Sequence, residues 1–245
     1  TLAWCSEAKG GAGASMADGF AIQRVVGEFA TPMPLAETLL AGWLLEQAGI
    51  DPPSGPMSVA PTNEAINLNL DEQGRLYGIV ERVPFARETE YLVALCKNSE
   101  NVEVVLVQRA ACGVACATNV AGEPRDQVSF EAVTPLNIAP VSTEFDPFKL
   151  KLMGATMRAM QMTGAIEKIL NMCVVYTQER IAFGRPIAKF QVIQHNLAIM
   201  AGELAAALTA TGAAANAFSN DEDSMDQIIL NVASAKIRVG EAANE

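Results

Sequence analysis

Between Tyr176 and Gln194 the sequence gathers cationic, aromatic and amide side chains around a break between two helical patterns. The break is Phe183-Gly184-Arg185-Pro186, since glycine tolerates positive φ and proline cannot donate a backbone hydrogen bond. Arg180 precedes the break, and Arg185 lies within it. Guanidinium groups beside two helix termini suit a pyrophosphate, through bidentate hydrogen bonds and free backbone N–H donors. The alternative is an ordinary interhelical loop whose basic residues are solvated.

Other residues that could do chemistry have simpler structural interpretations. Gly10-Gly11-Ala12-Gly13 superficially matches a nucleotide loop, but no strand precedes it, so a structural turn is favoured. His195 is the sole histidine and lacks a metal or nucleophile partner, which favours a structural role. Cys112 and Cys116 have no further ligands nearby, so thiol packing is favoured over metal binding. We expect no metal site.

Composition narrows the functional classes. The chain has 245 residues, 50% of them hydrophobic, which is enough for a large core. Its formal net charge of −11 repels a phosphate backbone, so nucleic acid is not an expected partner. Five scattered cysteines favour a reducing, cytoplasmic location without a disulfide framework. No secretory signal or uninterrupted apolar window of about eighteen residues is found, so membrane insertion is not expected.

The mean hydropathy of +0.20 is high for a soluble chain, and alanine and methionine on helical segments account for much of it. Such an excess is typical of large helix–helix or subunit contacts. We therefore expect a homo-oligomer.

The elements that position these residues fall into three parts, which predict an N-terminal helical domain at 1–55, a β domain at 56–145 and a C-terminal helical domain at 146–245. Apolar spacing predicts helices over Met16–Phe29 and Pro34–Ala48, separated by prolines. A proline-rich run at 51–56 then ends helical structure.

Short runs rich in β-branched residues predict an all-β unit in the middle of the chain. Its expected strands are Ile66–Leu70, Arg75–Val83, Tyr91–Cys96, Val102–Gln108 and Gln127–Phe130.

The remainder of the sequence is helical in pattern. Long helices are expected over Leu150–Ile181 and from about Ile187 to Phe218. Ser224 and Gln227 form a capping-box pattern that opens a third helix, expected to be still running at Glu245. The predicted fold class is α+β and multidomain: N-terminal helices, a middle β-barrel or sandwich, and an incomplete C-terminal antiparallel helical bundle.

The stretch Tyr176–Gln194 closely resembles the acyl-CoA dehydrogenase family pattern of an arginine, Phe-Gly-x-Pro-Ile, Phe-Gln and a following Gln. The order helices, β unit, helices matches that family as well. Weaker matches are the glycine segment at 10–15 and the β-unit segments Tyr77–Ala86 and Gly122–Phe130. The resemblance covers nearly the whole chain.

The resemblance implies an FAD-dependent oxidoreductase of fatty acid metabolism that converts an acyl-CoA thioester to a 2-enoyl-CoA. Each subunit of such a flavoprotein holds FAD between its β domain and its C-terminal helices, in a homotetramer or dimer. A glutamate removes the α-proton, a hydride goes to the flavin, and an electron-transferring flavoprotein or similar acceptor takes the electrons. Which acyl-CoA is used cannot be read from the sequence.

By the same resemblance, Arg180 would bind the FAD diphosphate of a neighbouring subunit. The adenosine side would be lined by Phe183, Ile187, Phe190 and Gln191. In the β unit, the family's Leu-Thr-Glu-Pro segment is replaced by Met57–Pro61, where only Ser58 offers a hydroxyl to the flavin.

Other departures affect the flavin and the catalytic base. The family's Trp-x-Thr position is Val83-Pro84-Phe85 here, and an Asp-x-x-Arg pair that contacts CoA is absent, with Arg158 a displaced substitute. The catalytic residue is unknown: the family's base lies beyond the third C-terminal helix, so we expect it beyond Glu245, in a longer form of the protein. Glu241 and Glu245 lie four apart, which indicates a solvated helix face.

These departures keep two alternatives open. One is a non-catalytic, dehydrogenase-like subunit that completes a partner's FAD site in a heteromer. The other is a flavin-dependent oxidase or monooxygenase on the same fold.

Overall fold

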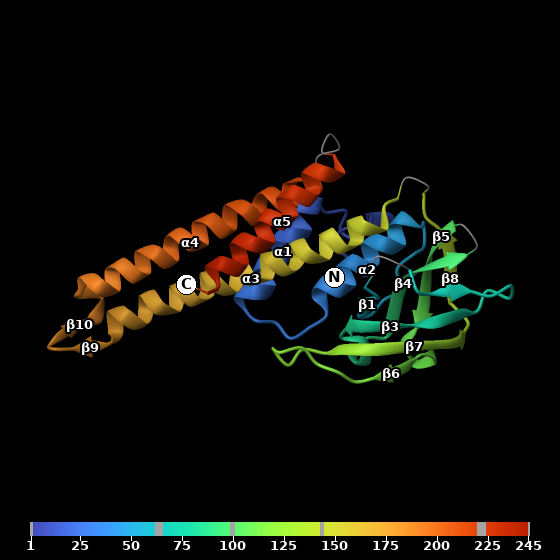
Figure 1. Ribbon diagram of the computed structural model, residues 1–245, viewed down its shortest axis with the longest axis horizontal. Helices are drawn as coiled ribbons and strands as arrows, with labels where there is room; N and C mark the ends of the chain where they lie inside the picture. Colours follow the sequence, from blue (N-terminus) through green and yellow to red (C-terminus); the bar gives the residue numbers. More distant parts are fainter. Residues whose placement is uncertain (1, 62–65, 99–100, 143–144, 220–223, 245) are drawn as a thin grey trace. The chain divides into compact units, whose positions relative to one another are not determined.

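The structure is a computed structural model that describes residues 2–61, 66–98, 101–142, 145–219 and 224–244 (Figure 1). Its chain divides into two compact units. The first comprises residues 1–14 and 32–154, and the second comprises 15–31 and 155–245. The first N-terminal helix therefore belongs with the C-terminal helices, whereas the second belongs with the β strands. The three domain boundaries drawn from sequence texture stay a prediction.

The first unit is a mixed β sheet with one long helix, α2 (Leu35–Gln47). Strands β6, β7, β3, β2, β4, β5 and β8 are neighbours in that order, and β1 pairs in parallel with β4. The strand bounds are β1 Met57–Val59, β2 Asn69–Leu70, β3 Leu76–Pro84, β4 Tyr91–Asn98, β5 Asn101–Gln108, β6 Gly113–Ala115, β7 Arg125–Val133 and β8 Asn137–Pro140.

Helix α2 is joined to the first strand of the sheet by a pair of hydrogen bonds. The Thr38 hydroxyl donates to the Met57 carbonyl at 3.0 Å and accepts from the Met57 amide at 3.1 Å. Both groups are buried, so each satisfies a polar atom that would otherwise be costly to desolvate. The core beneath the sheet is apolar, with Leu76, Leu92 and Phe130 among its fully buried members.

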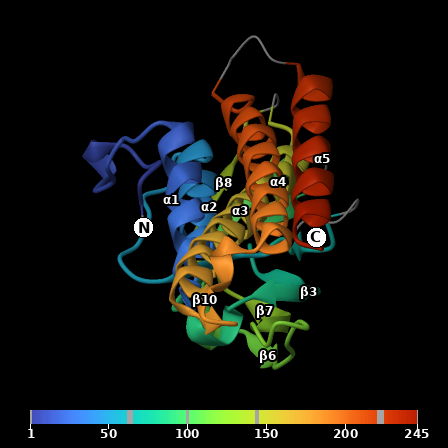
Figure 2. The same cartoon turned by 90° about the vertical axis from the view of Figure 1, so that its left-hand side faces the viewer.

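The second unit is built from helices, with a small hairpin between two of them (Figure 2). Its elements are α1 (Met16–Glu28), the greater part of α3 (Pro147–Glu179), β9 (Ile181–Ala182), β10 (Arg185–Pro186), α4 (Gln191–Asn216) and α5 (Met225–Ala242). Ser15 caps α1 in a capping box with Asp18, and the Ser224 hydroxyl accepts from the Gln227 amide at the start of α5. The predicted α+β class, with helices, a β unit and then an antiparallel helical bundle, is confirmed.

Several predicted boundaries are wrong. The helix expected from Ile187 begins as a 3₁₀ turn at Ile187–Lys189, and α4 starts only at Gln191. Among the described residues the third helix ends at Ala242, and Glu245, where the helix was expected to be still running, lies outside them. Strands β1, β6 and β8 went unpredicted because runs of three or four residues are too short to show an alternating pattern.

By length and hydropathy alone, α4 is one helix among the described residues that could cross a membrane. Its most apolar window has a mean hydropathy of 1.5, yet only 17% of that window is buried within the chain.

Close backbone approach joins α1 to α3 within the second unit. A Cβ atom added to Gly164 would lie 1.9 Å from the carbonyl oxygen of Arg24, and one added to Gly27 would lie 1.9 Å from that of Gln161. Each helix therefore presents a glycine to the other's backbone. The Arg24 guanidinium also pairs with Glu167 at 3.0 Å across the same crossing. Only glycine permits this separation, because the obstructing atoms belong to the backbone and cannot rotate away.

We predict that Gly164→Ala lowers the free energy of unfolding by about 1–3 kcal/mol or more, because the added methyl forces α1 and α3 apart. Gly202→Ala on α4 is the matched control: a Cβ there meets nothing within 4 Å, so it should raise stability by about 0.5–1 kcal/mol. Urea unfolding followed by circular dichroism measures both. Equal midpoints for the two variants would contradict the close crossing.

Candidate functional site

The two longest helices are joined by a tight β hairpin. Strand β9 pairs antiparallel with β10, with Ala182 opposite Arg185 and Ile181 opposite Pro186. The two residues between them, Phe183 and Gly184, have φ of 54° and 77°. Positive φ at both central positions is the pattern of a type I′ turn, whose twist matches that of paired strands. The tight turn predicted from Phe-Gly-x-Pro is therefore present.

Phe183 is an unusual residue for its position in this turn. Side chains other than those of Gly, Asn and Asp rarely adopt positive φ, since the Cβ atom crowds the backbone. The Phe183 side chain gains no burial in return, because it is 94% exposed. A strained, solvent-exposed aromatic residue points to a functional constraint on this position.

Backbone hydrogen bonds close the hairpin at its base. The Ile187 amide donates to the Arg180 carbonyl at 2.9 Å, which extends the ladder by one pair beyond β9 and β10. The Gln194 side-chain amide donates to the Ala188 carbonyl at 3.0 Å and so ties the first turn of α4 to the preceding 3₁₀ turn. No side chain caps the α4 N-terminus, and its first turn carries no acidic residue. This helix end can therefore offer backbone N–H donors to an anion.

An aromatic pair lies across the hairpin. The rings of Phe183 and Phe190 are 6.2 Å apart between centroids and cross at 80°, an edge-to-face arrangement. The Arg185 guanidinium carbon lies 4.4 Å from the centre of the Phe190 ring, within the range of a cation–π contact. The Phe190 ring thus holds one aromatic and one cationic neighbour in place.

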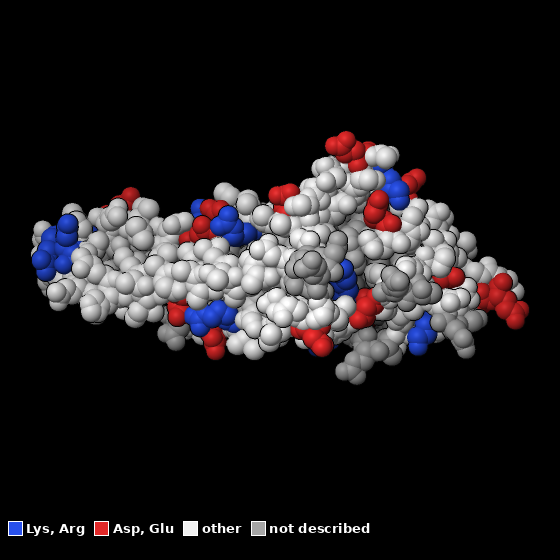
Figure 3. Space-filling model, turned by 90° about the horizontal axis from the view of Figure 1, so that it is seen from above, with Lys and Arg blue, Asp and Glu red and all other residues white. Residues whose placement is uncertain are grey.

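Positive charge gathers at this hairpin in a chain that is acidic overall. Arg180, Arg185 and Lys189 are exposed, and none forms an ion pair with a residue that the structure describes. Figure 3 shows blue side chains collected at the end of the long helices. Most other arginines on the described chain pair with carboxylates, at Arg24, Arg75, Arg87, Arg125 and Arg238. The hairpin therefore provides unneutralised cations to an anionic ligand.

The structure brings five of the six predicted cofactor residues into this one segment. Arg180, Phe183 and Gln191 are exposed, while Ile187 and Phe190 are half-buried. Their proposed roles toward FAD stay predictions.

Ser58, the sixth predicted residue, lies in the other compact unit and is fully buried in β1. Its hydroxyl donates a hydrogen bond to the carbonyl of Pro84. Phe85, which follows Pro84 at the family's Trp-x-Thr position, is also buried and has a φ of 52°. In this structure the β unit therefore buries the Ser58 hydroxyl, which was expected to reach a flavin, and also the Phe85 ring, which stands where the family has Trp-x-Thr.

A buried ion pair fixes the segment that follows Phe85. The Asp126 carboxylate, wholly buried on β7, accepts hydrogen bonds from the Arg87 amide at 3.0 Å and from the Arg87 Nε at 3.0 Å. It also accepts from the Ala117 amide at 3.1 Å, and the Arg87 guanidinium donates to the Ala117 carbonyl. One carboxylate thus joins three separate stretches of chain.

The balance of forces on Asp126 gives the pair a pH dependence. Burial by itself raises the pKa of Asp126, but the hydrogen bonds from Arg87 and from the two backbone amides outweigh it and hold the pKa below its usual value of 3.8. A lowered folded-state pKa stabilises the fold at pH values above 3.8, and this contribution is lost as the pH falls through the folded-state pKa.

The other candidate residues lie in varied surroundings, and their structural interpretations stay predictions. His195 is exposed on α4, and no group of three or more His, Cys, Asp or Glu side chains that could hold a metal occurs in the part of the chain that is described. Burial raises the pKa of the Cys112 thiol to about 11, so it stays protonated near neutral pH. Glu241 is exposed and pairs with Arg238 at 2.9 Å, as expected of a solvated helix face.

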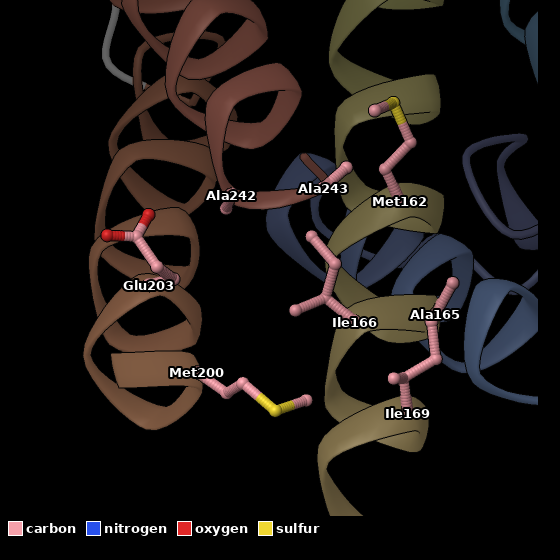
Figure 4. A pocket seen from close by; sticks show the side chains of 8 residues that line it. All are labelled: Met162, Ala165, Ile166, Ile169, Met200, Glu203, Ala242 and Ala243. Atoms are coloured by element: carbon pink, nitrogen blue, oxygen red, sulfur yellow. The ribbon is translucent and has the colours of Figure 1, made fainter. Parts of the chain in front are cut away.

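Sequence reasoning missed an apolar pocket inside the second unit. Side chains of α3, α4 and the end of α5 converge on a space of about 230 Å³ (Figure 4). Its lining comprises Met162, Ala165, Ile166, Ile169, Met200, Glu203, Ala242 and Ala243. The Glu203 carboxylate is the charged group in this lining, and it pairs with Arg238. Helical spacing favours a core position for Met162, whose polarizable sulfur would also suit an acyl-chain groove, and the spacing does not show which turns are left uncovered.

Known proteins match both the sequence and the fold. Residues 152–245 match a family model described as the C-terminal domain of acyl-CoA dehydrogenases, a segment that contains the hairpin. The acyl-CoA dehydrogenase IpdE2 of Mycolicibacterium smegmatis is 23% identical over 200 residues, which cover 81% of this chain and 56% of that relative. The human mitochondrial short-chain specific acyl-CoA dehydrogenase is 38% identical over 91 residues, covering 37% of this chain and 21% of that protein.

Among solved structures, the ChsE4–ChsE5 complex of Mycobacterium tuberculosis resembles the chain with a TM-score of 0.81 at 18% identity. The match covers 98% of this chain and 70% of that one. At such identity the likeness concerns the fold. The chain spans little more than half the length of the curated relative from Mycolicibacterium.

We predict that Asp126→Asn lowers the free energy of unfolding at pH 7 by about 1–3 kcal/mol, because Arg87 loses its charged partner. The difference in unfolding free energy between the variant and the unaltered protein should narrow as the pH falls below 3.8 and through the lowered folded-state pKa of Asp126, where the carboxylate becomes protonated. Glu123→Gln removes the exposed partner of Arg125 and serves as control, with an expected loss under about 1 kcal/mol. Denaturant titrations at several pH values give the comparison; a pH-independent difference would contradict the charged pair.

Proposed function

The chain belongs to the acyl-CoA dehydrogenase family, and from this membership we propose that it acts in the FAD-dependent α,β-dehydrogenation of an acyl-CoA thioester to a 2-enoyl-CoA. Members of this family are FAD-dependent flavoproteins. The observation that carries the proposal is the family match over residues 152–245. This segment includes a hairpin with three cations that no described carboxylate pairs with and a helix N-terminus that no described side chain caps.

The hairpin fits the charged middle of a dinucleotide. The FAD diphosphate is an anion, and Arg180, Arg185 and the α4 N-terminus offer donors that described carboxylates do not already occupy. The exposed Phe183 ring suits stacking or edge contact with a heterocycle. In this proposal Arg180 binds the diphosphate, whereas Phe183, Ile187, Phe190 and Gln191 line the adenosine side.

Bound FAD supplies the electron acceptor for a hydride removed from the acyl chain. The described residues of this chain supply binding and orientation, since the hairpin holds its cations and rings on a short, closed turn. The base for the α-proton is not assigned, because Glu241 is engaged with Arg238 on an exposed helix face. An electron-transferring flavoprotein or a similar acceptor, and a cytoplasmic location in fatty acid metabolism, belong to the same proposal.

Association with a second subunit is part of the proposed mechanism. The hairpin would serve the FAD of a neighbouring subunit, in a homo-oligomer such as a dimer or tetramer. Support comes from α4, which is strongly apolar although most of it is not covered by the chain itself. Exposed side chains such as Val192 and Ile199 give it a surface that a subunit contact would shield from water.

A second candidate function is a non-catalytic subunit that completes the FAD site of a different, dehydrogenase-like chain. The observation that favours it is the β unit, where Ser58 is buried and its hydroxyl is already used by Pro84, while Phe85 is also turned inward. In addition, the similar ChsE4–ChsE5 structure is a complex of two differently named chains. Such a subunit would keep the hairpin that binds the diphosphate and adenosine of FAD, and it would lack the residues that contact the flavin ring.

We predict that Arg180→Ala weakens FAD retention by about 1.5–3 kcal/mol, the contribution of a charge-assisted hydrogen bond. The protein is purified in the assembly that it forms, and its flavin content is read from visible absorbance before and after dialysis, with bleaching by an acyl-CoA as a second readout. Lys151→Ala, which removes a cation from the start of α3 near Phe148, is the control. A colourless protein that cannot be reconstituted with FAD would remove the proposal, and unchanged retention in Arg180→Ala would show that the site is misplaced.

Co-purification distinguishes the two candidate functions. A catalytic homo-oligomer should contain one kind of chain, bind FAD and oxidise acyl-CoA unaided. A completing subunit should bind FAD only together with a second dehydrogenase-like chain, with fewer than one flavin for each chain in the complex. Oxygen consumption without an added acceptor would instead indicate an oxidase or monooxygenase.

A further inference from the structure

The register of the hairpin places two arginines on one face. Arg180 directly precedes β9, and its carbonyl extends the ladder by one pair; because side chains alternate along an extended segment, this register places Arg180 on the same side as Ala182. Ala182 is paired with Arg185, and the Arg180 carbonyl is hydrogen-bonded to the Ile187 amide. Arg180 and Arg185 are therefore diagonal neighbours, for which Cβ atoms lie about 7–8 Å apart in antiparallel pairs. We propose that Arg185 is a second diphosphate-binding residue, which the Phe190 ring positions to act together with Arg180.

The contact with Phe190 orders the Arg185 side chain without using its hydrogen-bond donors. The guanidinium carbon lies over the Phe190 ring, 4.4 Å from its centre. A cation–π contact of this kind uses none of the five N–H donors as hydrogen-bond donors to a carboxylate, so they stay available to an anion. An arginine side chain loses conformational entropy when it becomes fixed, and a side chain already held against a ring has lost part of that entropy before binding. Arg185 is thus preorganised for an anion.

The charge around the hairpin favours the same ligand class. Arg180, Arg185 and Lys189 lie within ten residues, and none is neutralised by a described carboxylate. Bringing three cations together is unfavourable unless an anion joins them. A diphosphate carries at least two negative charges over two adjacent phosphates, so it can accept from both arginines at once.

Phe190 consequently has a positioning role that its predicted place beside the adenosine does not include. Its ring fixes Arg185 on one side and contacts Phe183 on the other. This inference rests on the proposed function, because the dinucleotide is taken to be FAD. The competing explanation is that the cations dock on an acidic surface of another protein chain.

The test uses the purified assembly and two probes that report on the phosphates without turnover. ADP carries the diphosphate and adenosine lacks it; their affinities are measured by calorimetry, and that of FAD by quenching of flavin fluorescence. The variants are Arg185→Ala, Arg185→Lys, Phe190→Leu and Arg180→Ala. Lys168→Ala is the matched control, because Lys168 stacks on the Phe29 ring at 5.4 Å elsewhere in the same unit.

Arg185→Ala should weaken ADP and FAD binding by about 10-fold or more and leave adenosine binding unchanged, as expected when a charged hydrogen bond is lost. Arg185→Lys keeps the charge and loses the planar fork, so an intermediate loss of about 3- to 5-fold is expected. Phe190→Leu should weaken ADP binding by about 2- to 5-fold, the value of an exposed cation–π contact. Lys168→Ala should bind both ligands like the unaltered protein.

Each contrary outcome has a distinct meaning. If the unaltered assembly binds neither FAD nor ADP, the proposed function fails and this inference fails with it. If Arg180→Ala loses affinity while Arg185→Ala and Arg185→Lys keep it, only the role of Arg185 is overturned. If Arg185→Ala leaves both affinities intact but reduces the mass of the assembly in light scattering, the cations serve protein docking and the inference is wrong. Thermal melts of every variant check folding. If Phe190→Leu unfolds, the affinity of Arg185→Lys for ADP tests whether Arg185 binds the diphosphate.

Discussion

Two consecutive residues with positive φ, Phe183 and Gly184, turn the chain back between its two longest helices, and the candidate site depends on this reversal. The turn fixes a register in which Ala182 faces Arg185. A loop one residue longer would move one arm by one position and send its side chains to the opposite face. The strain of a phenylalanine at positive φ is thus part of what gathers cations and rings into one surface.

The charge distribution gives this surface its chemical character. A chain with a net charge of −11 pairs half of its arginines with carboxylates, yet leaves those of the hairpin without a described carboxylate partner. Long-range repulsion of anions by the acidic chain and local attraction at the hairpin act together. They favour a ligand whose negative charge is concentrated in one place, as in a dinucleotide diphosphate, over an extended polyanion such as nucleic acid.

The β unit follows a different principle, because its polar groups serve the fold. Asp126 joins three stretches of chain through Arg87 and the Ala117 amide, and Ser58 is tied to Pro84. Hydrogen bonds made inside the unit leave these groups unavailable to a ligand. In the proposed function, the hairpin offers free cations to a ligand, whereas the Ser58 hydroxyl of the β unit is buried. This combination fits a site assembled from more than one chain.

By itself the sequence determined the order of helices and strands, the tight turn at Phe183–Gly184 and the family resemblance, because all three are local patterns of spacing and residue type. It did not determine that Ser58 is buried, that Arg185 stacks on Phe190, or that α5 ends at Ala242. The sequence pattern also did not predict the short strands or the apolar pocket. Tertiary structure decided these features, because burial, stacking and pairing depend on which segments lie close together in space. The pattern of residues along the chain does not specify those contacts.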